Sequence, residues 1–210
     1  MKRQDTIAKI ILEEFKSGKH NNRLVINDII SYGIYDECIA IYKGLGGISN
    51  QFPVNFGKWD IDCSDFIIEF DEEQHFNRYR AFTLTSIIYN KHNRTFANEY
   101  LNYCIDYEVN CLRKSSFGNY WTNDSTEKQF GESDPPGQLG TSGSSRWKQR
   151  AYYDFLRDVY GIIYDIPVIR ISIYDIVREN NNQYSLNQIL KNKNVNISDT
   201  IINLLYSKVP

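Results

Sequence analysis

The sequence predicts an α/β domain in which a central mixed β-sheet is flanked by helices. The first observation is a pair of strand-like segments: residues 58–62 alternate polar and apolar side chains, and residues 66–70 form a short apolar run. The second is an apolar segment at residues 168–173, which is typical of a buried strand. The third is the helical spacing of apolar residues over much of the remaining chain.

Composition and charge bound the classes of protein. The 210 residues are 41% hydrophobic and 14% aromatic, which suffices for one well-filled core, so we predict a single domain, residues 1–210, with an insertion at about 84–145. The formal net charge of −2 gives no global attraction for nucleic acid. Four cysteines without a CxxC pair argue against structural zinc. No segment is apolar enough for a signal or a membrane span, so we expect a cytoplasmic protein without a membrane partner.

The N-terminal half is predicted to be mainly helical up to the paired strands. Apolar residues at helical spacing predict a helix over residues 5–17, and residues 25–42 predict one or two helices that stop at the glycines of residues 44–47. Residues 52–56 are expected to lead as a strand into the pair.

The C-terminal half is predicted to alternate helices with one long loop. Helices are expected over residues 79–89 and 96–112, followed by a loop at residues 115–145 that is rich in Gly, Ser, Asn, Thr, Asp and Pro. Ser145 is the predicted cap of a helix from about residue 146 to 160, with Gly161 just past its end. After the apolar strand, short helices are expected to include Ile176, Leu186, Ile189, Leu190 and residues 201–205.

The strand pair predicts a β-hairpin with a two-residue turn at residues 64–65. This turn places Ile61 opposite Ile68 and Asp60 opposite Glu69. Because side chains alternate along a strand, the isoleucines point into a core and the carboxylates point the other way.

The opposite face of this hairpin is predicted to carry Asp60, Asp62, Glu69 and Asp71. Like charges this close repel unless a cation or protons intervene, and hard divalent cations take oxygen ligands of this kind. The simplest interpretation is therefore a metal site. The alternative is a set of solvated carboxylates on the wet face of an antiparallel sheet.

The hairpin and a later segment together resemble a known family. An Asp on one strand (Asp60), Glu-x-Asp on the next (Glu69 and Asp71), and then Gln74-His75 resemble the PD-(D/E)xK nuclease superfamily, closest to its very-short-patch repair endonuclease branch. Residues 148–161 are similar to the Arg-bearing helix of that branch, and residues 166–171 are similar to its Val-hydrophobic-Arg-hydrophobic strand. The resemblance covers residues 51–83 and 146–174 and implies a restriction-endonuclease-like core.

This sequence departs from the family pattern at two points. The usual Lys, two residues after the Glu, is Asp71, which does not offset phosphate charge. A long segment also separates the two similar blocks. Either metal ions carry more of the role of that Lys, or a basic residue does so, with Lys58, Lys148 and Arg150 as the candidates.

The resemblance implies an Mg²⁺-dependent endonuclease, with Mn²⁺ as a substitute metal. Asp60 and Glu69 would hold the metal, with Asp62 replacing Asp60 if the register of the hairpin shifts. Asp71, Gln74 or His75 would orient the attacking water.

The start of the later helix carries three basic residues, Arg146, Lys148 and Arg150. Together with the positive end of the helix dipole, they are predicted to hold nucleic-acid phosphates. The alternative is a solvated basic turn. The partners that we expect are nucleic acid, with DNA favoured by the resemblance alone, and a second copy of the chain.

Two other classes of function stay open. One is a non-catalytic nucleic-acid-binding module that has kept the nuclease fold, for which Asp71 and the acidic net charge are the arguments. The other is a glycoside hydrolase, but Asp60 and Glu69 as ladder neighbours lie too close for the inverting geometry.

Overall fold

The computed structural model describes residues 2–179, 182–191 and 197–208 and has a mixed α/β fold. The chain divides into two compact units. The first comprises Met1–Asn22, Lys58–Glu72 and Asp165–Pro210, and the second comprises Arg23–Gly57 and Glu73–Tyr164. In the described part of the chain, no helix is both long and apolar enough to cross a membrane. All four cysteines lie in the described part of the chain, are buried and form no disulfide.

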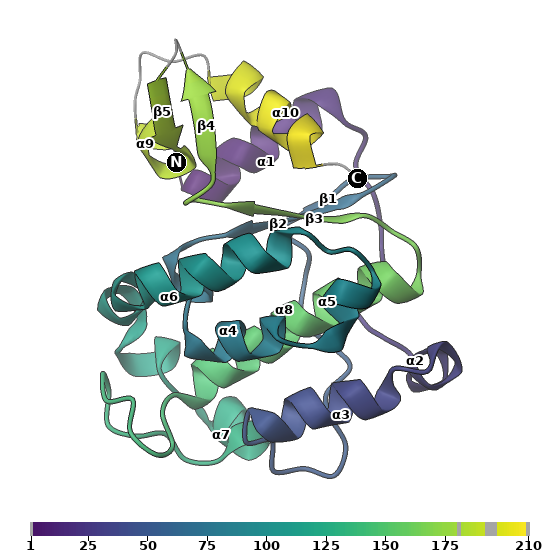
Figure 1. Ribbon diagram of the computed structural model, residues 1–210, viewed down its shortest axis with the longest axis vertical. Helices are drawn as coiled ribbons and strands as arrows, with labels where there is room; N and C mark the ends of the chain where they lie inside the picture. Colours follow the sequence, from purple (N-terminus) through teal and green to yellow (C-terminus); the bar gives the residue numbers. More distant parts are fainter. Residues whose placement is uncertain (1, 180–181, 192–196, 209–210) are drawn as a thin grey trace. The chain divides into compact units, whose positions relative to one another are not determined.

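The first unit contains the small mixed sheet that the sequence predicts (Figure 1). Its strands are β1 (Ile61–Asp62), β2 (Ile67–Asp71) and β3 (Val168–Ser172), in the order β1-β2-β3. Strand β1 is antiparallel to β2, and β2 is parallel to β3. The predicted hairpin register is confirmed, because Ile61 pairs with Ile68 and Cys63 N donates to Phe66 O at 3.0 Å.

Helices α1 (Arg3–Glu14) and α10 (Ile197–Lys208) contact one another, and α10 contacts β3. Each helix buries one apolar stripe, and these stripes include Ile7, Ile11, Ile201 and Leu205. Full burial of such a side chain contributes about 1.5–3 kcal/mol. Helix α1 ends before the predicted residue 17, because Phe15 is already extended and packs edge-on against Phe66 at 5.1 Å.

The prediction of short helices after residue 173 was wrong for its first part. Ile176 lies in β4 (Ile176–Glu179), which pairs with β5 (Asn182–Ser185), while α9 (Leu186–Lys191) and α10 are helices as expected. Val177 is buried and pairs with Tyr184. A cross-strand pair of a β-branched and an aromatic residue favours a strand, and this pairing outweighs the short apolar spacing.

The second unit starts with α2 (Ile26–Tyr32) and α3 (Tyr35–Gly44), which confirms two helices before the glycines. Gly33, with a φ of 80°, ends α2. The predicted strand at residues 52–56 was wrong: it is reduced to one bridge between Arg23 and Asn55 and a bond from Leu24 N to Val54 O. Pro53 has no N–H to extend this pairing.

The predicted helix at residues 79–89 is two helices, α4 (Arg78–Leu84) and α5 (Ile87–Lys91). The break lies at Ser86, whose side chain accepts from Ile88 N and so begins a new helix. The 3₁₀ turn η1 (Glu73–His75) precedes α4, and the long helix α6 (Phe96–Ser115) follows α5.

The predicted long loop at residues 115–145 was wrong in its middle. It contains the 3₁₀ turn η2 (Gly118–Tyr120) and the helix α7 (Asp124–Phe130). Asn123 and Thr126 form a capping box that begins α7, and Phe130 buries its side chain. The polar composition of this segment gives no helical apolar pattern, so the helix was not predicted. It is stabilised by the capping box and by the buried side chain of Phe130.

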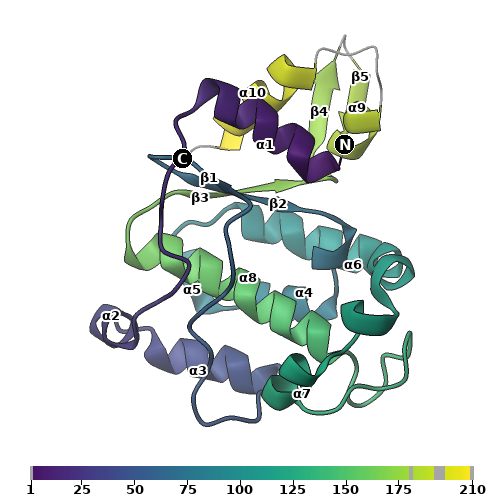
Figure 2. The ribbon, with the colours of Figure 1, turned by 180° about the vertical axis from the view of Figure 1, so that it is seen from behind.

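Helix α8 (Ser145–Ile163) is the central helix of the second unit and contacts α3, α4 and α7 (Figure 2). Its cap is Ser144 rather than Ser145, because Ser144 Oγ accepts from Trp147 N. Gly161 lies inside the helix and is buried, whereas it was predicted to follow the end. Gly161 does not adopt the left-handed conformation that ends a helix, so α8 continues to Ile163.

Candidate functional site

The acidic hairpin, residues 60–71 of the first unit, holds the carboxylate of Asp60 at both oxygens. Gln4 Nε2 donates to Asp60 Oδ1 at 2.8 Å, and Phe70 N donates to Asp60 Oδ2 at 3.0 Å. A carboxylate that accepts two hydrogen bonds is restricted to one orientation. Asp60 is therefore fixed in place by α1 and by the partner strand β2.

Glu69 lies directly beside Asp60. Asp60 N donates to Glu69 Oε1 at 3.3 Å, and only 2% of the surface of Glu69 is exposed. The confirmed register thus makes Asp60 and Glu69, the two acids that the sequence singled out, neighbours across the hairpin, joined through the backbone N–H of Asp60. A buried carboxylate is costly unless hydrogen bonds, a proton or a cation compensates it.

Asp62 is directed toward a different partner. Its Oδ2 accepts from His20 N at 2.8 Å, and its Oδ1 lies 2.6 Å from His20 Nδ1. The same loop is tied to the hairpin by a bond from Gly18 N to Asp62 O at 2.7 Å. Asp62 therefore holds this loop against the hairpin.

Asp71 is buried and forms an ion pair with Arg170 of β3. Arg170 Nη1 lies 3.1 Å from each oxygen of Asp71, and both side chains are almost completely buried. Arg170 pairs in register with Glu69, so its side chain is on the same face of the sheet as Glu69 and Asp71. A buried guanidinium is costly without an opposite charge, and Asp71 supplies one for Arg170. The face thus carries one guanidinium beside the carboxylates of Glu69 and Asp71.

In the second unit, η1 positions Gln74 and His75 just before α4. His75 Nδ1 lies 2.9 Å from Asp154 Oδ2, and Arg157 Nη1 lies 3.4 Å from Asp154 Oδ1. Asp154 is completely buried in α8. The sequence analysis missed Asp154, although its spacing of four residues from Arg150 is a signal that both lie on one face of the helix.

The three basic residues of α8 do not lie together. Arg146 and Arg150 line one pocket, whereas Lys148 lies over the ring of Tyr79, with its Nζ 5.7 Å from the ring centroid. Residues four apart share a helix face and residues two apart do not, so Lys148 is separated from the two arginines by the geometry of the helix. Burial lowers the pKa of all three side chains.

The backbone donors at the start of α8 already have partners within the protein. Ser145 N donates to Ser133 Oγ at 2.9 Å, Arg146 N donates to Trp121 O at 3.2 Å, and Trp147 N donates to Ser144 Oγ at 3.1 Å. A phosphate bound at this end of the helix would therefore be held by side chains rather than by the N–H groups of the helix.

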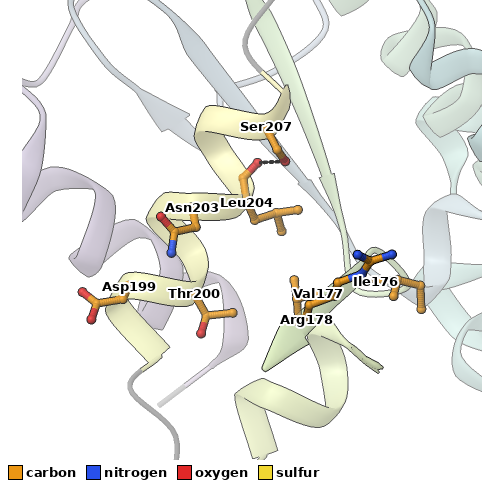
Figure 3. Close-up of a pocket in the computed structure, with 8 residues that line it drawn as sticks. All are labelled: Ile176, Val177, Arg178, Asp199, Thr200, Asn203, Leu204 and Ser207. Atoms are coloured by element: carbon orange, nitrogen blue, oxygen red, sulfur yellow. Dashed lines mark hydrogen bonds between the residues drawn. The ribbon is translucent and has the colours of Figure 1, made fainter. Parts of the chain in front are cut away.

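The first unit also contains a pocket of about 470 Å³ between β4 and α10 (Figure 3). Val177 and Leu204 provide apolar surface, and Thr200 and Asn203 provide polar groups. No residue of the acidic hairpin lines this pocket.

Comparison with known proteins yields one family. The profile of a family of unknown function (DUF7255) matches residues 40–192, well over half of the chain, and the match includes the acidic hairpin, α8 and β3. No curated protein and no solved structure matches the chain.

Proposed function

Since the chain belongs to DUF7255, a family of unknown function, we propose an activity from its own residues: metal-dependent hydrolysis of phosphodiester bonds. DNA is the favoured substrate, by the resemblance alone. The observation that carries the proposal is the hairpin register, which makes Asp60 and Glu69 neighbours across the two strands, with Asp60 N donating to Glu69 Oε1 at 3.3 Å. Two neighbouring carboxylates on one sheet face supply the oxygen ligands that Mg²⁺ and Mn²⁺ prefer.

The arrangement of the strands supports a restriction-endonuclease-like core as the finer description of the fold. An antiparallel hairpin carries the acids, and a strand parallel to its second member follows α8 in the sequence. Fold alone does not select restriction, repair or defence as the biological role.

The residues of the hairpin fit a divalent metal. When bound, the metal would lower the pKa of a water and offset charge on the phosphate. Asp60 is oriented by Gln4 and Phe70 N, so little reorganisation is required of it. Arg170 balances the charge of Asp71, which limits the repulsion that Asp71 would otherwise add beside Glu69.

The test compares Asp60→Asn and Glu69→Gln with Asp65→Asn, which changes an exposed acid in the turn of the same hairpin. We expect Mg²⁺-dependent cleavage of DNA by the unchanged protein and by Asp65→Asn, and a loss of at least about 100-fold in the other two. Binding of Mn²⁺, measured by calorimetry, should weaken in the same two variants. Binding of DNA without cleavage in any metal would reject the enzyme and leave a non-catalytic binding module.

A further inference from the structure

The second unit contains a polar pocket of about 610 Å³ that the acidic hairpin does not line. The pocket is formed by one side of the η2–α7 segment and by the first two turns of α8. The residues that carry its chemistry are Asn119, Tyr120, Asn123, Arg146, Gln149 and Arg150.

Two arginines dominate the charge of this pocket. Arg146 and Arg150 are one helical turn apart; Arg146 Nη1 donates to Gln149 Oε1, and Arg150 Nη1 donates to Gln74 O at 3.2 Å. Among residues 2–179, 182–191 and 197–208, no carboxylate lies within 4.0 Å of either guanidinium. Burial lowers the pKa of both, the charge of Arg146 lowers the pKa of Arg150 further, and the charge of Asp154 acts in the opposite direction on both.

Two partly buried guanidiniums with no carboxylate in direct contact, and with the single charge of Asp154 nearby, favour an anion. Each has several N–H donors and has used one in a bond to a neutral oxygen, so donors are left for a ligand. The planar fork of Arg suits the oxygens of a phosphate, and charge-assisted bonds of this kind are about twice as strong as neutral ones.

The other wall of the pocket is aromatic and amide in character. Tyr120 is 47% exposed and packs edge-to-face on Phe117, with ring centroids 5.4 Å apart and an interplanar angle of 75°. This contact supports the ring while leaving much of it open to solvent. The Asn119 side chain adds amide donor and acceptor atoms.

We infer that this pocket binds an unpaired nucleotide of a single-stranded nucleic acid. The phosphate contacts Arg146 and Arg150, and the base stacks on Tyr120. An aromatic ring beside basic side chains suits single strands, because only an unstacked base offers its face to a side chain. The inference rests on the proposed function for the class of substrate, but it concerns binding and not cleavage.

The test measures binding of a short fluorescent single-stranded DNA oligonucleotide by anisotropy, in EDTA so that no metal-dependent cleavage occurs. We expect Arg146→Gln with Arg150→Gln to weaken binding by at least about tenfold, and Tyr120→Leu by about tenfold. Lys91→Gln and Tyr206→Leu, which remove an exposed charge and an exposed ring outside the pocket, should bind as the unchanged protein does. Tyr120 is exposed, so this variant tests the pocket even if the arginine variants unfold.

Three results would overturn the inference. The first is that Tyr120→Leu and the arginine variants, if folded, all bind the oligonucleotide as tightly as the unchanged protein. The second is that duplex DNA binds as tightly as the single strand. The third is that a free mononucleotide displaces the probe at equal concentration. The two proposals fail separately. If the protein does not cleave DNA but the pocket variants lose binding, the pocket proposal stands and the nuclease proposal is rejected. If cleavage requires Asp60 but the pocket variants bind normally, the nuclease proposal stands and the pocket proposal is rejected.

Discussion

The guanidinium of Arg170 is buried on the same sheet face as the carboxylates of Glu69 and Asp71. Removal of one partner of a buried ion pair leaves the other charge uncompensated, which typically costs about 3–5 kcal/mol. Asp71→Asn should therefore lower the free energy of unfolding by about 3 kcal/mol, as measured by urea denaturation. Asp71→Asn with Arg170→Met should recover part of this loss, and Asp65→Asn should change little. If Asp71→Asn is as stable as the unchanged protein, the ion pair of Asp71 and Arg170 contributes no stability.

His75 allows a second prediction at the level of a single side chain. Its Nδ1 is held by the buried Asp154, so the orientation of its imidazole ring is fixed. If His75 takes part in proton transfer in the proposed nuclease, His75→Gln should reduce cleavage by about 100-fold or more. Binding of Mn²⁺ at Asp60 and Glu69 should be unchanged, because His75 is not one of the proposed ligands. His92→Gln, also a partly buried histidine of the second unit, is the control, and equal cleavage by the two variants would remove His75 from the mechanism.

The sequence predicts some site residues and not others for physical reasons. Asp60 and Glu69 follow from strand alternation and a two-residue turn, which involve only neighbouring residues. The partner of Arg170 follows from the cost of burying a lone charge. Tyr120 and Asp154 were missed, because their roles depend on how distant helices pack, and a local pattern does not contain that information.

At the level of helices, Arg78 of α4 is joined to Glu108 of α6. Arg78 donates from Nε at 2.8 Å, from Nη2 at 2.8 Å and from its backbone N at 2.9 Å. Burial would raise the pKa of Glu108, but these bonds and the charge of Arg78 lower it below its usual value of 4.5. A lowered pKa in the folded state means that the stabilisation is complete above the unfolded pKa and is lost as the pH falls through the folded pKa.

Arg78→Gln should therefore destabilise the protein near pH 7 and have a smaller effect in acid. Arg78 is half exposed, so solvent screening limits the expected loss to about 1 kcal/mol. The difference between the two proteins, measured by urea denaturation from pH 7 downward, should shrink below about pH 4. Lys9→Gln removes an exposed pair in α1 at 3.8 Å and should have almost no effect. A difference that is constant with pH would assign the effect of Arg78 to packing alone.

The elements that were predicted well are those with one strong local signal. The hairpin and β3 have clear apolar patterns, and α8 has a long buried face. Helix α7 was missed, because it is short and mostly polar and is specified by its cap and by Phe130. Strand β4 was predicted as a helix, because a segment of four residues is too short to distinguish the apolar period of a helix from that of a strand. The pairing with β5, which follows β4 in the chain, is not visible in the pattern of β4 itself.

For the whole molecule, the formal net charge of −2 means that any nucleic acid must be held by a local basic site. We propose the pocket with Arg146 and Arg150 as this site, and because it is small, few counterions should be released on binding. Each phosphate neutralised on a single strand contributes about −0.7 to the slope of log affinity against log salt concentration. We expect a slope of about −1 to −2.

The arginine variants test this salt dependence directly. If both arginines hold one phosphate, Arg146→Gln with Arg150→Gln should reduce the steepness of the slope by about 0.7, while Lys91→Gln should leave it unchanged. Anisotropy titrations of single-stranded DNA at several salt concentrations in EDTA measure the slope. A slope steeper than about −3 that is the same in all variants would show that nucleic acid binds to another basic surface. The next residues to substitute would then be the exposed pair Arg113 and Lys114 at the end of α6.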